Sequence, residues 1–192
     1  MTAQDVLDFW FLAPGSEGHG QQRGEWFRKD EAFDAAIRER FGVLIEQAVA
    51  GGLREWDEQG PTGILARILV LDQFTRNACR GTAASFAGDS LALAAAEKLV
   101  ANGADKTLLP VQRWFAYMPF EHAEDARMQE RSVSLFTALA EEQPGYEGVL
   151  DYAHRHRGVI ARFGRFPHRN AILGRASTAD ESAYLEQPGS GF

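Results

Sequence analysis

Hydrophobic residues recur at steps of three and four along most of the chain, a spacing that predicts α-helices rather than strands. The clearest helix starts near Asp30 and continues to Gly51-Gly52, a pair that favours a helix end. The same spacing predicts a helix that begins at Asp89, a short one after Thr178, and five others over residues 3–12, 63–79, 109–118, 128–139 and 148–163. Polar, glycine-rich stretches at 15–24 and 187–192 predict a mobile loop and a tail.

Several residues mark where these helices begin and end. Thr2 and Thr178 each precede an acid by three residues, which is the spacing of a capping box. Asp89 is expected to be the N-cap of the helix that follows it. Pro119 is expected to interrupt or kink the helix over 109–118, because proline lacks the amide hydrogen that a helical bond needs.

About eight helices joined by short connections, with no convincing strand between them, predict an all-α fold in which neighbouring helices pack antiparallel. A chain of 192 residues has the size of one domain with a single core, so residues 1–192 are interpreted as one domain. Helix pairs of about 35 to 45 residues would suit a stack of helical repeats, but no repeated signature residues support that arrangement.

Composition and charge exclude several classes of protein. With 20 lysines and arginines against 27 acids, the net charge of −7 argues against a general nucleic-acid binder. No apolar stretch reaches the length of a membrane span, and the acidic N-terminal segment differs from a secretory signal, so a cytoplasmic protein is expected. The single cysteine, Cys79, excludes an internal disulfide and a site with several cysteine ligands, and no cofactor is expected.

The first candidate site lies in the strongly apolar helix over 63–79. Asp72 and Arg76 are four residues apart and share one helix face with apolar neighbours. A buried ionised carboxylate is costly unless it is paired, so one interpretation is a buried ion pair that fixes helix packing. The other interpretation is that Arg76, with Gln73 and Asn77 nearby, faces a cavity and holds a ligand.

The second candidate is the segment 117–125, in which His122 lies among acids. Because Glu121, Glu124 and Asp125 fall near an expected helix start, they could simply complement the helix dipole. His122 adds a candidate base. The spacing is not that of a zinc-protease motif, and it favours a hydrogen-bonded structural histidine over a metal ligand.

The third candidate is the most informative. Residues 152–175 hold six arginines and three histidines but no acid, and removing these six positive charges from −7 leaves −13 on the rest of the chain. Arginine suits bidentate recognition of carboxylates or phosphates, and a turn broken by glycine and proline supplies backbone amides and the side chains of Arg165, His168, Arg169 and Asn170. The alternative is that these arginines pair with acids on other helices of the same chain.

The chain resembles a widespread bacterial family of uncharacterised proteins, domain-of-unknown-function family 924, in three segments: LDQFTRNACRGTAASFAGD (71–89), YMPFEHAED (117–125) and RFGRFPHRNAILGR (162–175). The early segment VLDFWF and Glu25-Trp26-Phe27 also match, so the resemblance spans nearly the whole chain. Thr75 departs from the family pattern, in which proline is common at this position. The resemblance implies an all-α fold similar to the right-handed array of tetratricopeptide repeats, and it implies no established reaction.

Two functions are compatible with these residues. The first is a non-catalytic helical binding module that holds an acidic peptide or protein, or a small anion, on a concave side formed by Asp72, Gln73, Arg76, Asn77, His122 and the turn at 165–170. The second is a small enzyme that uses a carboxylate and a histidine as general acid and base on an anionic substrate, with the pair drawn from Asp72, Glu124, His122 and His168. In a plainer outcome all these charges pair internally. An exposed apolar helix face could also support a homodimer.

Overall fold

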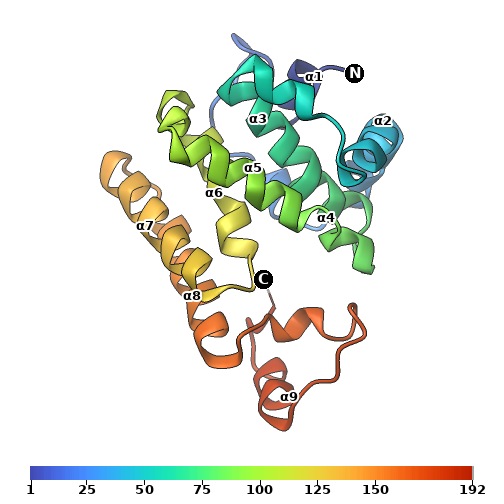
Figure 1. Cartoon of the computed structure of the whole chain (residues 1–192), viewed down its shortest axis with the longest axis vertical. Coiled ribbons are helices and arrows are strands. Elements are labelled where there is room, and N and C mark those ends of the chain that lie inside the picture. The colour runs from blue at the N-terminus through green and yellow to red at the C-terminus, as the bar shows by residue number, and fades with distance from the viewer. Residues whose placement is uncertain (192) are drawn as a thin grey trace.

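The computed structural model of the protein describes residues 1–191, and within that range it consists of helices and turns without a strand. The nine α-helices of this part of the chain are α1 (Ala3–Phe11), α2 (Glu31–Val49), α3 (Pro61–Ile68), α4 (Thr75–Ala78), α5 (Asp89–Ala101), α6 (Pro110–His122), α7 (Ala126–Glu142), α8 (Glu147–Phe163) and α9 (Ala179–Leu185). Figure 1 shows α1 to α6 gathered at one end, the α7–α8 hairpin beside α6, and α9 at the opposite end. The all-α prediction is confirmed, and the tetratricopeptide-like arrangement stays a prediction.

The core is built from aromatic side chains on helices that are distant in sequence. Trp10 on α1, Phe41 on α2 and Phe115 on α6 are fully buried, and the rings of Trp10 and Phe115 meet edge to face with centroids 5.4 Å apart. A second small cluster joins Ile160 on α8 to Phe166 in the C-terminal segment. The chain therefore has one main core, to which its C-terminal part is attached by separate contacts.

Most helix boundaries agree with the sequence predictions. Thr2 and Thr178 both form the expected capping boxes, and Asp30 caps α2 through the amides of Ala32 and Phe33. The predicted loop at 15–24 consists of turns in which Arg23 donates to backbone carbonyls of α1, and its mobility stays a prediction. The predicted tail ends at residue 192, which lies outside the described residues.

Three predictions about helix ends and helix starts were wrong. Pro119 does not interrupt the helix, because α6 continues through it to His122; its neighbours are buried, and packing outweighs the one missing backbone bond. A kink at Pro119 stays a prediction. Glu121 and His122 consequently lie at the end of α6 rather than at a helix start, and Asp125 alone is a cap, bonded to the first amides of α7. The carboxylate of Asp89 does not cap α5, since Gly88 is the N-cap residue there.

The apolar helix predicted over 63–79 contains an irregular turn. Between α3 and α4 the chain forms a π-helical segment, Leu69–Phe74, whose six residues are all buried. Such turns widen a helix locally and are frequent at functional sites. This segment carries Asp72 and Gln73, so the irregularity lies at the first candidate site.

Gly88 allows the start of α5 to approach this π-helical segment closely. A Cβ atom added to Gly88 would lie 2.1 Å from the carbonyl oxygen of Leu71. We therefore expect Gly88→Ala to lower the free energy of unfolding by about 1 to 3 kcal/mol, because the two backbones must separate. Urea unfolding measures this change. Gly158→Ala is the matched control: a Cβ there meets nothing within 4 Å on the surface of α8, so we expect a gain of about 0.5 to 1 kcal/mol.

Candidate functional site

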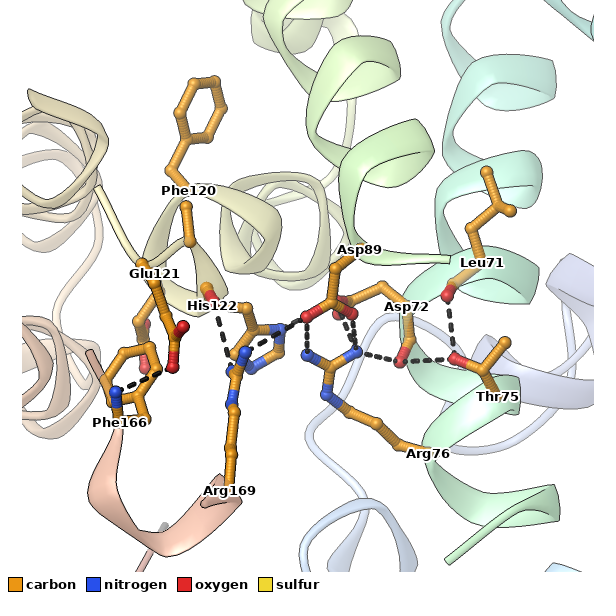
Figure 2. Close-up of polar contacts among 12 residues, drawn as sticks. Leu71, Asp72, Thr75, Arg76, Asp89, Phe120, Glu121, His122, Phe166 and Arg169 are labelled. Carbon is orange, nitrogen blue, oxygen red and sulfur yellow. Dashed lines mark hydrogen bonds and ion pairs between the residues drawn. The ribbon is translucent and has the colours of Figure 1, made fainter. Parts of the chain in front are cut away.

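Five polar residues from four parts of the chain meet beside the π-helical segment. We call them the central polar cluster: Asp72, Arg76, Asp89, His122 and Arg169. Figure 2 shows Arg76 and Arg169 converging on Asp89, with the His122 ring beside them. The cluster thereby joins the end of α6 and the C-terminal segment to the N-terminal helices.

Asp72 is the buried centre of this cluster, with a side chain that is 0% exposed. Its carboxylate accepts hydrogen bonds from His122 Nδ1 at 2.7 Å and from Gln73 Nε2 at 2.6 Å, and it lies 2.8 Å from Arg76 Nη1. Burial by itself raises the pKa of this carboxyl, but the charge of Arg76 and the two hydrogen bonds lower it below its ordinary value. Asp72 is therefore ionised, and the predicted buried pair with Arg76 is confirmed.

Asp89 bridges the two arginines of the cluster. Arg76 donates to it through Nη1 at 2.8 Å and through Nη2 at 3.1 Å, while Arg169 Nη1 lies 3.2 Å away. The guanidinium of Arg169 also lies 4.6 Å from the ring centroid of Phe86. Burial, followed by the nearby charge of Arg76, lowers the pKa of Arg169 to about 10, which still leaves it charged at neutral pH.

His122 is held in one orientation by its neighbours. Burial and the charge of Arg76 lower its pKa, and they outweigh the opposing effect of Asp72. The imidazole is therefore neutral at pH 7, and because Asp72 can only accept, Nδ1 carries the hydrogen and donates it. Nε2 is then the nitrogen with a free lone pair. This is the arrangement in which a buried carboxylate orients a histidine base.

The charges of the cluster balance, and part of it meets solvent. Two carboxylates face two guanidiniums, with a neutral imidazole between them. The side chains of Asp89 and Arg76 are 22% and 19% exposed, against 12% for His122 and 7% for Arg169. The Nε atom of Arg169 is buried and has no hydrogen-bond partner. The solvent-facing edge of the cluster thus presents Arg76 and Asp89.

The other predicted site residues are placed around this cluster rather than in it. Asn77 donates to Asp34, and Glu124 forms a two-bond pair with Arg175. Arg165 pairs with Glu181, which does not belong to the cluster. The Asn170 side chain accepts a hydrogen bond from Arg175 and donates one to the Ser177 hydroxyl. The centroid of the His168 ring lies 5.7 Å from that of the Phe166 ring.

All six arginines of residues 152–175 have carboxylate partners within the chain. The partners, in order along the sequence from Arg155, are Asp151, Glu130, Asp180, Glu181, Asp89 and Glu124. Asp151 lies on α8 itself, and the other five acids lie on other parts of the chain, so the basic segment is matched largely as the internal-pairing alternative predicted. Its turn begins at Gly164, which ends α8 with a φ of +70°, a left-handed conformation suited to glycine.

The comparisons with known proteins agree with this architecture. Residues 6–189 match the family described as "Bacterial protein of unknown function (DUF924)". The chain belongs to this family. A structure of a protein of unknown function from Agrobacterium tumefaciens is 41% identical to this DUF924 protein, covers 96% of each chain and superposes with a TM-score of 0.81. A search of curated proteins finds no match.

The DUF924 chain also contains site residues that its sequence did not reveal. The Glu121 carboxylate lies 2.9 Å from His156 Nδ1, and both side chains are almost completely buried. Phe86 forms the aromatic surface beside Arg76 and Arg169. These contacts connect residues that are far apart in sequence, so no local spacing could have indicated them.

Two further observations concern metal ligands and membrane spans among the described residues. No group of three or more histidine, cysteine, aspartate or glutamate side chains within 1–191 is arranged to hold a metal ion. In the same range no helix is both long and apolar enough to cross a bilayer.

Proposed function

We propose that this protein binds a small anionic ligand at the solvent-facing edge of the central polar cluster, and that His122 takes up a proton as the ligand binds. The observation that carries this proposal is the neutral His122, fixed by Asp72 at 2.7 Å, beside two guanidiniums that share one partly exposed carboxylate. A cytoplasmic location belongs to the same proposal and is supported by the single cysteine.

Charge balance is the physical reason for coupling the anion to a proton. The charges of the cluster cancel, so a bound monoanion would add one unmatched negative charge in a mostly buried environment. Protonation of His122 removes this excess, and the ionised Asp72 stabilises the imidazolium that forms. The affinity for the anion is therefore expected to increase as the pH falls.

A small ligand suits this cluster better than a peptide does. Asp72 is completely buried and only the edges of Arg76 and Asp89 are accessible, so an extended chain would find few contacts. A compact carboxylate or phosphate can instead compete with Asp89 for the two guanidiniums. The unpartnered Nε of Arg169 is a further donor close to this place.

The Asp72–His122 pair also supports a second candidate function, general acid–base catalysis. With Nδ1 donating to Asp72, Nε2 of His122 could accept a proton from an anionic substrate held by Arg76. The enzyme would use the same cluster as the binding protein, with a ligand that carries an acidic hydrogen. Turnover of a bound anion would distinguish the enzyme from a binding protein.

A thermal-shift screen at pH 6 and pH 8 tests the proposal, with phosphorylated metabolites, di- and tricarboxylates and nucleotides as probes. A ligand at about 100 times its dissociation constant adds about 2.7 kcal/mol, which corresponds to a rise in melting temperature of about 5 to 10 °C. We expect one class of anion to give such a rise, and the rise to be larger at pH 6.

Two variants make this screen specific. His122→Gln cannot take up the proton, so the difference between pH 6 and pH 8 should disappear. Arg165→Ala is the matched control, because Arg165 pairs with Glu181 outside the cluster, and it should keep the full response. The absence of a shift with every anion, or an equal shift in wild type and His122→Gln at both pH values, would contradict the proposal.

A further inference from the structure

An open groove of about 340 Å³ lies between α5 and α7. Its apolar floor contains Val100, Phe120 and Met128, and Arg127 and Arg131 form the rim on α7. In Figure 1, α6 passes between α5 and the α7–α8 hairpin, in agreement with the place of Phe120 in the floor. The groove shares no residue with the central polar cluster.

We propose that this groove binds an acidic segment of a partner protein. Carboxylates of the segment pair with Arg127 and Arg131, while one of its apolar side chains contacts the floor. The proposal is independent of anion binding at the central polar cluster.

Charge complementarity carries this assignment. Arg127 and Arg131 are exposed and, within residues 1–191, neither has a carboxylate partner, whereas all six arginines of residues 152–175 are paired. This contrast is notable because the chain has an excess of acids, with a net charge of −7. Two unmatched cations beside a groove with an apolar lining make a site that an acidic, partly apolar segment complements.

The spacing of the two arginines restricts the geometry of the partner. They are four residues apart on α7, so their side chains leave the helix about 6 Å from one another. Two carboxylates one helical turn apart, or two residues apart on an extended strand, match this separation. Glu97 on the α5 rim requires that the other side of the segment be neutral or basic.

The open shape of the groove favours a protein segment over a small molecule. Sites for small molecules usually surround most of the ligand surface. A peptide can instead contact both rims and the floor at once, as in other grooves that recognise a helix or an acidic motif.

The experiment is a selection of displayed random 12-residue peptides on the full-length chain, followed by affinity measurements on the recovered peptides. We expect the recovered peptides to carry two acids with the spacing described and at least one apolar residue. Their affinity should fall at least about tenfold for the double variant Arg127→Glu/Arg131→Glu. Replacing the two acids of a peptide with lysine should reverse the preference, so that the variant binds it more tightly than wild type does.

The control variant is Arg28→Glu/Arg155→Glu, which makes the same change in net charge at two exposed arginines outside the groove. It should retain the wild-type affinity, and both double variants should keep the wild-type helical circular dichroism. Recovered peptides without acids, or peptides that bind the groove variant as tightly as wild type, would show the proposal to be wrong. Self-association that only the groove variant abolishes would assign the groove to a second copy of this chain instead.

Discussion

Replacing Asp72 with alanine is expected to lower the free energy of unfolding by about 3 to 5 kcal/mol. Asp72 is 0% exposed, and its carboxylate is bonded by Arg76, His122 and Gln73. Without it, Asp89 is the one remaining carboxylate for the two guanidiniums of the cluster, so a positive charge is left partly buried and unmatched. Urea unfolding followed by circular dichroism gives the change directly.

Two other substitutions show which part of this loss comes from charge. Asp72→Asn keeps the shape of the side chain and removes its charge, so a loss close to that of alanine would assign the effect to the buried ion pair. Asp151→Ala breaks the exposed pair with Arg155, in which Asp151 is 57% exposed, and should cost less than about 1 kcal/mol. A loss below about 1 kcal/mol for Asp72→Ala would contradict the buried-pair interpretation.

The contrast between Asp72–Arg76 and Asp72–His122 shows what the sequence could predict. Asp72 and Arg76 are four residues apart, so helical periodicity alone placed them on one face and predicted their ion pair. His122 is 50 residues from Asp72, and its contact depends on how α6 packs against the π-helical segment. Periodicity indicates which face of a helix is apolar, but it does not indicate which two helices meet.

Asp89 shows the same limit in another way. An acid just before an apolar helix is typical of an N-cap, and this local pattern predicted the wrong role. In the structure Gly88 is the cap, and the Asp89 carboxylate bridges Arg76 and Arg169. Long-range charge pairing thus replaced a local hydrogen bond. Arg76 and Asp89 nevertheless both lie in segment 71–89, which resembles the family. The resemblance therefore indicated the region of the cluster, but it did not predict which side chains pair.

Acidification from pH 6.5 to pH 4 is expected to lower the free energy of unfolding by about 3 kcal/mol through His168 alone. Burial, followed by the charge of Arg169, lowers the pKa of His168 to about 4 from an ordinary value of 6.5. The unfolded chain takes up a proton at this residue below pH 6.5, while the folded chain does so only near pH 4. The stabilisation is therefore complete above pH 6.5 and is lost as the pH falls. Urea unfolding at half-unit steps of pH measures the slope.

The variant His168→Gln distinguishes the contribution of this histidine to the pH dependence of stability from the contribution of the acids. The variant lacks the titrating imidazole, so its free energy of unfolding should change much less than that of wild type between pH 6.5 and pH 4.5. His122 contributes in the same direction, because its pKa is also lowered by burial, and the remaining slope should flatten further in His122→Gln. The carboxylates of Asp72 and Glu124, whose pKa values are lowered in the folded chain, also begin to lose their stabilising effect as the pH approaches the ordinary values of 3.8 and 4.5. The difference between wild type and each histidine variant, rather than the slope of wild type alone, therefore reports the histidines. An unchanged slope in His168→Gln would place its titration near that of an exposed histidine and would contradict the burial that the structure assigns to it.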